Sequence, residues 1–465
     1  MTALPSTQTL PLPAPASAPI PRISFTEGFL RYRNDRVKLL AELGDARADI
    51  VLSRMGPLRL YFVTEAKLAQ TILLDRSGSF RKGPAVDKHS RPLLGNGLLT
   101  CRNEDSRVQR KILAPKFQPR HIAGFAQTMI DLTLEAVARW RTETPTDVDR
   151  EITRLTMSIA ARTMFGSDIT EEDIEALYEG INVSNRWIIN RSTNPVSMPL
   201  WMPTARNRKV KQTISALDDV VYRLLAEHKE RGTEGNVLSA LLAARDDDGN
   251  GMTDELIRDQ IITFFVAGHE TISTTLGWAY RLSCERPELA DQIAAEAEEV
   301  FGPLDAPSAR PDPRGLTITN AVLQEVMRLR PAAYMIGRQA TEDVEVGPHT
   351  LPAGSFVVVN TTGIHRRSDY FEDPLTFRHE RFLQEPTWPK TAYQPFGAGR
   401  RVCIGKHFAL MEGTIVLALI CRAMRFHHNG RHDFDPEQGS DGLLESEPMI
   451  TLRPTSEFPC TMTPR

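Results

Sequence analysis

The spacing of apolar and polar positions predicts a chain built mainly from helices. The longest helical pattern begins after Thr253, which suits an N-cap because Asp254 and Glu255 follow in the first turn, and Pro287 ends it. Residues 261–267 are apolar on nearly every face of this helix, so we expect it to be buried. Further helical patterns cover most of 104–165, and then 171–190, 205–231, 288–301 and 319–329.

A few short runs of β-branched residues predict strands between the helices. Residues 50–52 and 58–63 flank Met55-Gly56-Pro57 and are typical of a hairpin, and residues 355–359 are typical of a buried strand. Residues 83–100 are rich in glycine and proline, which predicts a long loop. The predicted fold class is therefore mainly α with minor β.

The N-terminal segment 1–22 has a different character. It is rich in proline and has neither a basic start nor an unbroken apolar run, which argues against a signal peptide or a membrane anchor. We expect a disordered, partly polyproline-II tail at 1–22. Residues 23–465 are then one large domain, although length alone would suggest about three. The net charge of −3 gives no overall indication of nucleic acid or of an anionic membrane as a partner.

The five cysteines are widely spaced and form no CxxC pair, which makes a zinc site or a thioredoxin-like site improbable. This usage predicts free thiols and a cytoplasmic location. One of the five, Cys403, lies in the segment Phe396-Gly397-Ala398-Gly399-Arg400-Arg401-Val402-Cys403-Ile404-Gly405. A buried thiol in a glycine-rich turn is the simplest interpretation of such a segment.

Physical chemistry favours a metal-binding role for this segment. Its glycines let the backbone lie close to a flat object, where a Cβ atom would collide. A helical pattern follows Gly405, and the N-terminal end of a helix favours a thiolate at Cys403. A thiolate is a strong ligand for a redox metal, and haem iron is the planar candidate. Arg401 is placed to meet an anionic propionate, and Phe396 to shield the sulfur from water.

A second pattern, Ala267-Gly268-His269-Glu270-Thr271, lies within the longest predicted helix. The Thr271 hydroxyl can donate to the carbonyl four residues back, and Gly268 allows the helix to open there. An acid at Glu270, an alcohol at Thr271 and trapped water would together form a proton relay. The alternative is an ordinary core helix with a tolerated glycine.

The Cys403 segment resembles the haem-binding loop of cytochromes P-450, and three further segments resemble family motifs in the same order along the chain. The pattern at Glu270 and Thr271 is similar to the oxygen-activating helix. Glu325 and Arg328, in an ExxR spacing that alone would be an ordinary surface pair, and Arg381 resemble a structural charge network that supports the haem loop. Residues 106–117 resemble the helix that reaches a haem propionate.

The resemblance assigns two more propionate arginines. Arg110 fits the W-x-x-x-R or H-x-x-x-R pattern of the propionate helix, but Ser106 stands where tryptophan or histidine is expected. Arg338 fits the other family arginine. Cofactor-binding residues implied by the resemblance are Arg110, Arg338, Phe396, Arg401, Cys403 and Gly405.

The resemblance implies a single-domain cytochrome P-450 fold, with haem b between the long central helix and the helix of the cysteine loop, and Cys403 as the axial iron ligand. The expected activity is insertion of one oxygen atom of O2 into an apolar substrate such as a fatty acid, terpenoid or steroid, with Thr271 and Glu270 delivering protons. Expected pocket residues, most of them apolar, are Val86, Phe264, Phe265, Ala267, Ala333, Tyr334, Met335, Ile336, Leu443 and Leu444.

The expected partners are a ferredoxin or flavodoxin with its NAD(P)H reductase, and the chain is expected to be a monomer. A basic face would steer the acidic electron carrier, with members Arg107, Lys111, Lys116 and Lys406. Three alternatives remain open at this point: a peroxide-driven oxygenase, a haem-thiolate isomerase, and a haem gas sensor without catalysis.

Overall fold

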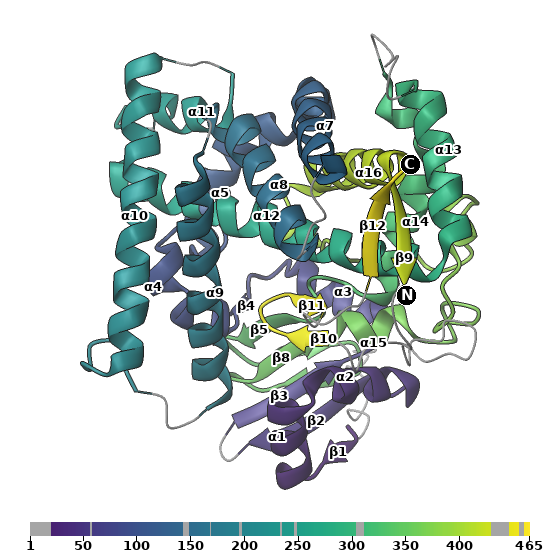
Figure 1. The fold of residues 1–465 in the computed structure, drawn as a ribbon. Helices are drawn as coiled ribbons and strands as arrows, with labels where there is room; N and C mark the ends of the chain where they lie inside the picture. The colour runs from purple at the N-terminus through teal and green to yellow at the C-terminus, as the bar shows by residue number, and fades with distance from the viewer. Residues whose placement is uncertain are drawn as a thin grey trace, which may run out of the picture.

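A computed structural model describes residues 20–465 except 56–57, 143–147, 168, 195–197, 233–234, 246–248, 304–310, 429–445 and 455–459. Its helices surround one long central helix, α12 (Asp254–Glu285), and a sheet lies at one end of the molecule (Figure 1). The prediction of a mainly α chain with minor β is confirmed.

Helix α12 is buried because apolar residues cover nearly all of its faces, as the sequence predicts. The Thr253 side chain accepts a hydrogen bond from the Leu256 N–H at 3.2 Å, so the expected N-cap is confirmed. Helices packed along α12 are α8 (Val148–Ala160), α10 (Ala205–Arg231), α14 (Thr317–Leu329) and α16 (Lys406–Ala423).

The remaining helices follow the chain around this centre. They are α1 (Phe25–Asn34), α2 (Arg36–Asp45), α3 (Ala66–Leu74), α4 (Arg91–Leu94), α5 (Asn103–Leu113), α6 (Pro119–Ile122), α7 (Ala126–Thr142), α9 (Glu171–Thr193), α11 (Val237–Ala243), α13 (Pro287–Phe301) and α15 (Thr361–His365). Short 3-10 or π segments are η1 (Ala85–His89), η2 (Ala114–Phe117), η3 (Ala123–Phe125), η4 (Ala161–Phe165), η5 (Pro313–Gly315), η6 (His379–Phe382) and η7 (Gly399–Arg401).

A mixed sheet joins strands from residues 22–82 with strands from residues 336–359, in the order β1-β2-β3-β8-β5-β4. Its strands are β1 (Arg22–Ile23), β2 (Ile50–Met55), β3 (Leu58–Val63), β4 (Phe80–Lys82), β5 (Ile336–Ala340) and β8 (Phe356–Val359). The predicted hairpin is the antiparallel β2–β3 pair, and β3 runs parallel to β8 with Leu60 opposite Phe356. Two-stranded ribbons are β6 (Val344–Val346) with β7 (His349–Leu351), β9 (Met424–His428) with β12 (Cys460–Pro464), and β10 (Ser446–Pro448) with β11 (Leu452–Pro454).

The structure corrects several expectations. Residues 83–100 are not one loop, because η1 and α4 form within them. Residues 104–165 are mostly helical, as expected, but in several segments: Pro115 is the second residue of η2 and Pro119 begins α6. Arg22, expected in the tail, already belongs to β1, while residues 1–19 lie outside the described residues.

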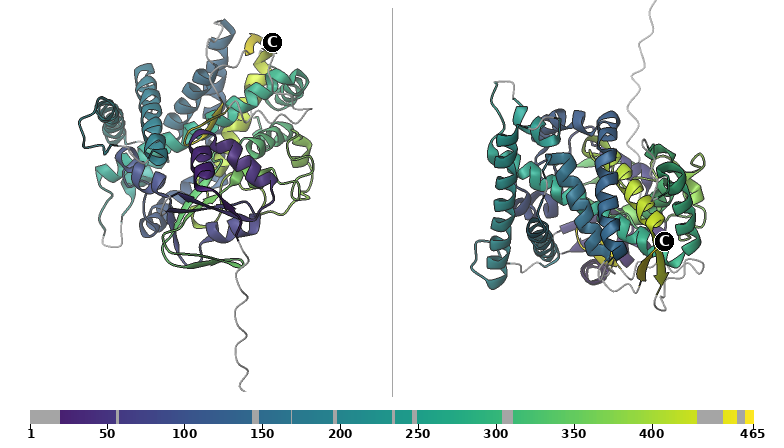
Figure 2. Two further views of the ribbon diagram at one scale, coloured as in Figure 1. Left: turned by 90° about the horizontal axis from the view of Figure 1, so that it is seen from below. Right: turned by 45° about the horizontal axis from the view of Figure 1, so that its top comes forward.

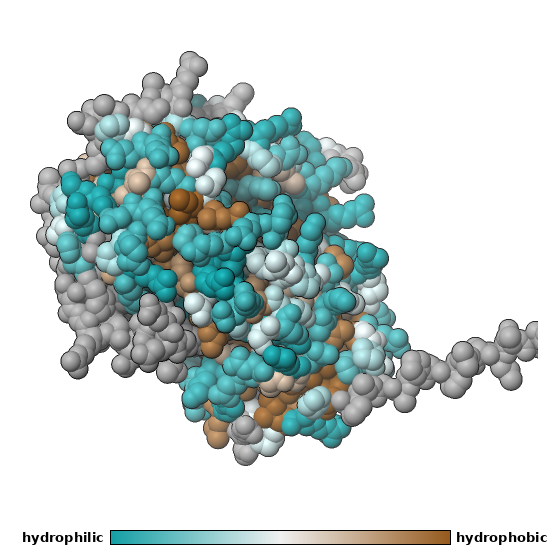
Figure 3. Space-filling model, turned by 90° about the vertical axis from the view of Figure 1, so that its right-hand side faces the viewer, coloured by the Kyte–Doolittle hydropathy of each residue, from teal (hydrophilic) through white to brown (hydrophobic). Residues whose placement is uncertain are grey.

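Cys284 is disulfide-bonded rather than free, a contact that sequence spacing cannot reveal because folding brings distant segments together. Among the described residues no helix is both long and apolar enough to cross a bilayer. Figure 2 shows the sheet end and the helical end from two further sides, and the face in Figure 3 is largely hydrophilic with small apolar patches.

Candidate active site

The cysteine loop is held by its own backbone and by α3. The Cys403 N–H donates to the Phe396 carbonyl at 2.9 Å, which closes the loop just before α16. Gly399 has φ +70°, and a Cβ atom there would lie 2.1 Å from the Leu73 carbonyl oxygen of α3. Glycine is therefore required at 399 both for its backbone conformation and for the close approach.

The electrostatics of Cys403 combine two opposing influences. Its side chain keeps accessible surface, yet protein surrounds the thiol on most sides, and burial raises its pKa. The Gly405 N–H, the Arg110 guanidinium and the Lys406 ammonium act in the opposite direction and favour the thiolate. Burial therefore opposes the thiolate that the N-terminal end of the helix was expected to favour at Cys403. A metal cation bound to the sulfur would stabilise the thiolate.

Three arginines predicted as cofactor residues converge on this loop from three elements. Arg110 of α5 donates to the Val402 carbonyl at 2.6 Å. Arg401 donates to the Cys101 carbonyl at 3.0 Å and to the Asn103 side chain at 2.9 Å. Arg338 of β5 donates only to the Gly337 carbonyl among the described residues, at 3.0 Å.

These guanidiniums repel one another. Burial, together with the positive charge of Arg401, lowers the pKa of Arg338 to about 10. Burial also lowers the pKa of Arg110, again with Arg401 contributing. Within the described ranges none of the three forms an ion pair with a carboxylate. All three arginines are half-buried, and partly desolvated cations without an anionic partner are costly, so the arrangement suits a ligand that carries negative charge.

The middle of α12 has the geometry expected from its sequence pattern. The Thr271 hydroxyl donates to the Ala267 carbonyl at 2.9 Å. Ala267 is exposed and Thr271 half-buried, although residues 257–266 around them on the same helix are almost all buried. A Cβ atom at Gly268 would meet only ordinary contacts, so this glycine is not needed for packing. One side of α12 is therefore open at Ala267 and Thr271.

The Glu270 carboxylate does not extend into that open side, and its expected role in a proton relay with Thr271 stays a prediction. Its carboxylate is 2% exposed and accepts hydrogen bonds from Asn185 at 2.8 Å, Thr451 at 2.9 Å and Arg453 at 2.9 Å. These donors come from α9 and from the chain around β11. The carboxylate therefore links α12 to α9 and to the chain around β11.

The predicted charge network is assembled at the far end of α14. Glu325 and Arg328 are fully buried and form two hydrogen bonds, of 2.7 Å and 2.8 Å. Arg381 lies 3.4 Å from the Glu325 carboxylate. Arg328 also donates to the carbonyls of His365 and Pro374, at 2.8 Å and 2.7 Å.

Sequence reasoning missed His365, which extends this network to the cysteine loop. His365 Nδ1 lies 3.2 Å from the Arg328 carbonyl, and its Nε2 accepts the Gln394 N–H at 3.0 Å. Gln394 in turn accepts the Gly397 N–H at 3.0 Å. Burial lowers the pKa of His365 to about 3, so the ring is neutral at physiological pH and can accept from Gln394.

The expected pocket residues divide into two groups. Phe264, Phe265 and Tyr334 are buried: the Phe264 ring stacks on Phe117 at 5.4 Å between centroids, and the Phe265 ring lies tilted against Phe165 at 4.8 Å. Their expected role in a substrate pocket stays a prediction. The half-buried or exposed members are Val86, Ala267, Ala333, Met335 and Ile336, and Leu443 and Leu444 lie outside the described residues.

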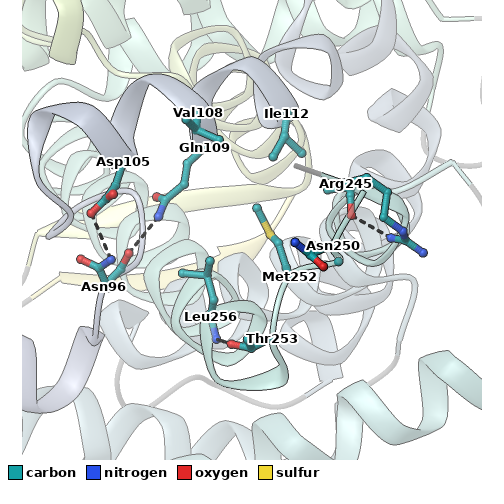
Figure 4. Close-up of a pocket in the computed structure, with 12 residues that line it drawn as sticks. Asn96, Asp105, Val108, Gln109, Ile112, Arg245, Asn250, Met252, Thr253 and Leu256 are labelled. Carbon is teal, nitrogen blue, oxygen red and sulfur yellow. Dashed lines mark hydrogen bonds between the residues drawn. The ribbon is translucent and has the colours of Figure 1, made fainter. Parts of the chain in front are cut away.

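A separate pocket of about 280 Å³ lies on the other side of α5 (Figure 4). Val108, Gln109 and Ile112 of α5 face Met252 and the start of α12 across it. None of its lining residues belongs to the predicted site, so α5 carries the pocket on one face and Arg110 on another.

Comparison with known proteins gives this site its class. The family model of cytochrome P-450 matches residues 17–453. The chain is 33% identical over 394 residues to cyclooctatin synthase of Streptomyces melanosporofaciens, covering 84% of this chain and 85% of that protein. It is 31% identical over 386 residues to pentalenene oxygenase of Streptomyces avermitilis, covering 82% and 84%.

A plant relative is more distant: cytokinin hydroxylase of Arabidopsis thaliana is 30% identical over 391 residues, covering 80% of this chain and 75% of that protein. The chain belongs to the cytochrome P-450 family, whose model spans nearly all of it. It is an oxidoreductase of the monooxygenase type, and family membership implies a haem cofactor, redox partners and a hydrophobic substrate.

The residues present fit a haem. Cys403 offers one sulfur ligand with an N–H donor and two cations beside it. The three half-buried guanidiniums have no carboxylate partner among the described residues, and two propionates would provide one. The chemistry of this donor set is that of a thiolate-ligated, doubly anionic cofactor.

Proposed function

We propose that this chain is a haem-thiolate monooxygenase that binds haem b through Cys403 and hydroxylates a terpenoid. The observation that carries the haem assignment is the convergence of Arg110, Arg338 and Arg401 on the Cys403 loop without a carboxylate partner. The terpenoid assignment is supported by the names of two relatives, cyclooctat-9-en-7-ol 5-monooxygenase and pentalenene oxygenase.

The chemistry that haem b supplies when bound is activation of O2 by two electrons and two protons, so that one oxygen atom enters a C–H bond and the other leaves as water. The chain contributes the Cys403 sulfur as the iron ligand, the arginines that would bind the propionates, and the open side of α12. There, Thr271 holds water by its hydroxyl, which donates to Ala267 and leaves its oxygen free to accept.

The apolar substrate would meet Ala267 and the half-buried residues Val86, Ala333, Met335 and Ile336. Ile336 lies beside the cysteine loop, since a Cβ atom at Gly397 would be 3.4 Å from its Cδ1. A rigid hydrocarbon suits such a lining because few hydrogen-bond donors converge on it.

We further propose a cytoplasmic monomer that takes electrons from a ferredoxin or flavodoxin and its NAD(P)H reductase. Support comes from the basic face: Arg107, Lys111 and Lys406 are exposed, and Lys116 is half-buried. Lys406 lies 5.9 Å from the centre of the Phe396 ring, so this face adjoins the cysteine loop.

The test begins with the protein expressed with ample iron and haem precursor. We expect a carbon-monoxide complex with the absorption typical of thiolate ligation, lost in Cys403→Ala. Terpenoid hydrocarbons, fatty acids and steroids are then compared by the shift of the haem absorption band on binding and by product mass with isotopic O2. A colourless protein would contradict the haem assignment, and a binding shift with fatty acids alone would contradict the terpenoid assignment.

The alternatives give different outcomes in the same assay. A peroxide-driven oxygenase would form product with hydrogen peroxide as fast as with redox partners. An isomerase would form product without consuming reductant, and a gas sensor would hold a stable oxygen complex. The monooxygenase requires separate redox partners, so turnover with NADPH alone would contradict it.

A further inference from the structure

The pocket of about 280 Å³ between α5 and the start of α12 is separate from the Cys403 site (Figure 4). Val108 and Ile112 of α5 form one of its walls, and Met252 and Leu256 face them from the other side. These four side chains are apolar, and all of them but the exposed Val108 are half-buried. A concave site with apolar walls and a few polar groups is typical of small-molecule binding.

Hydrogen-bond acceptors gather at one end of this pocket, where Asn96 lies beside Asp105 and Gln109 (Figure 4). The Asn96 Nδ2 donates to the Asp105 carboxylate at 3.3 Å, which is long for a hydrogen bond. Asp105 is half-buried, and it forms no ion pair in the part of the chain that the structure describes. A carboxylate can accept about four hydrogen bonds, so most of its capacity is unused.

Gln109 adds a second acceptor at the same end. Its Nε2 donates to the Asn96 carbonyl at 3.0 Å. The residue is 3% exposed, and its Oε1 accepts no hydrogen bond from any described residue. A buried amide oxygen without a donor is unfavourable. This end of the pocket therefore suits a group that carries positive charge and several N–H donors.

Arg245 lies on the opposite side of the pocket from Asp105 (Figure 4). Its Nη1 donates to the carbonyls of Leu242 and Ala244 at 2.9 Å and 2.7 Å, and a β-bridge pairs Arg245 with Gly251. These contacts hold that wall in place without a ligand. The Arg245 side chain is exposed, so water and salt screen its charge more than that of the half-buried Asp105.

We propose that this pocket binds a small amphipathic cation, with its N–H donors on Asp105 and its apolar body between α5 and α12. The pairing of a charged donor with a half-buried carboxylate is stronger than a pair at an exposed surface. An aromatic body suits the walls, because the Met252 thioether makes favourable contacts with rings. Arylalkylamines and aryl amidines belong to this class. The inference goes beyond the proposed function, since no residue of the Cys403 site takes part.

A purely structural role for Asp105 is the competing explanation. Asp105 lies in the first turn of α5, where an acid is favourable, and it holds the Asn96 side chain. A pocket that exists only as a gap in the packing would not distinguish a cation from a neutral molecule of the same shape. Probes that differ in charge alone therefore separate the two explanations.

The experiment uses the full haem-loaded chain and three probes of nearly the same shape: benzamidinium, neutral benzamide and anionic benzoate. Benzamidinium keeps its proton at neutral pH and so has no lone pair to offer to the iron. Isothermal titration calorimetry measures the Kd of each probe. The haem absorption band is followed in the same titrations, because a probe that enters the Cys403 site would move it.

Three variants locate the binding. Asp105→Asn removes the charge and keeps the shape, and Leu256→Phe fills part of the pocket. Glu104→Gln is the matched control, because Glu104 is the neighbouring exposed acid on α5 and does not line the pocket. Denaturant unfolding of each variant checks that the fold is intact.

We expect the wild type to bind benzamidinium at least about tenfold more tightly than benzamide or benzoate, with the haem band unmoved. Asp105→Asn should remove this preference, Leu256→Phe should weaken benzamidinium binding by a similar factor, and Glu104→Gln should match the wild type. Absence of binding, equal Kd values for the three probes, tighter binding of benzoate, or an unchanged preference in Asp105→Asn would overturn the inference. So would a moved haem band together with a Kd that Leu256→Phe leaves unchanged, since the probe would then lie in the Cys403 site.

Discussion

Arg110 donates a hydrogen bond of 2.6 Å to the carbonyl of Val402, the residue before Cys403. Helix α5 is thereby fastened to the cysteine loop at the point where the sulfur ligand emerges. The same guanidinium lowers the pKa of the Cys403 thiol against the effect of burial. One side chain thus contacts the backbone beside the ligand and, with the Gly405 N–H and Lys406, favours its thiolate form.

Replacing Arg110 by methionine should raise the pKa of the Cys403 thiol in the haem-free protein, because burial would then be less opposed. The measurement is the rate of alkylation at Cys403 against pH, resolved by peptide mass spectrometry. Arg107→Met, on the same helix but exposed, is the control and should leave the profile in place. A profile that Arg110→Met does not move would contradict the electrostatic role.

Thr271→Ala should separate reductant consumption from product formation. Without the hydroxyl, water on the open side of α12 loses its anchor, and reduced oxygen should escape as peroxide. Product per NADPH is expected to fall severalfold while NADPH consumption continues. Thr271→Ser keeps the hydroxyl and should stay near the wild type; unchanged coupling in Thr271→Ala would remove Thr271 from the proton path.

Arg453→Met should destabilise the protein by about 2 kcal/mol, because the buried Glu270 carboxylate would lose a charged donor. Adding Glu270→Gln to that variant should cost less than Glu270→Gln alone, since the two groups interact directly. Denaturant unfolding of the two single variants and the double variant measures the coupling. If the changes in unfolding free energy of the two single variants simply add up in the double variant, the Arg453–Glu270 pair does not link α12 to β11.

Arg328→Met should cost about 3–5 kcal/mol, since it leaves the fully buried Glu325 carboxylate without its main partner. The check is chemical unfolding together with the fraction of thiolate-type carbon-monoxide complex. Arg378→Met is a suitable control, because that side chain pairs only with exposed Glu372 and Asp373. Similar losses in the two variants would argue against a special role for the buried pair.

Acid should weaken the fold through His365. Its folded pKa is about 3, below the ordinary value of 6.5, so the unfolded chain binds the proton more readily. The contribution to stability is complete above about pH 6.5 and declines toward pH 3, by at most about 1.4 kcal/mol per pH unit. Unfolding free energies across this range, compared with those of His365→Gln, check the sign: the variant should show a shallower decline.

Much of the helical framework was predictable because local signals and tertiary packing agree. Thr253 caps α12 where the sequence places the cap, and the hairpin at Met55 has the expected antiparallel strands. The prediction of one long loop at 83–100 was wrong because glycine and proline content indicates turns, whereas contacts with α12 stabilise short helical segments there. Asp259 accepts the Asn96 N–H, and Arg258 donates to the Leu93 carbonyl.

Contacts within a short motif of the site were predictable from the sequence. Contacts between side chains from distant parts of the chain were not, because they depend on tertiary packing. The cysteine loop and the Thr271–Ala267 bond follow from short spacings. The partners of Glu270, Asn185 and Arg453, could not be predicted because they come from distant parts of the chain. His365 was missed for a similar reason: nothing near it in the sequence indicates that it contacts the Arg328 carbonyl and the Gln394 N–H.

The pairing of β3 with β8 has a consequence for how the protein is made. Leu60 lies opposite Phe356, so the β2–β3 hairpin, which is synthesised early, can pair with β8 only after most of the chain has been translated. Until then the outer edge of β3 is unsatisfied and prone to join other nascent chains. Slower growth at low temperature, or more chaperone, should therefore raise the yield of active protein more than extra haem precursor does.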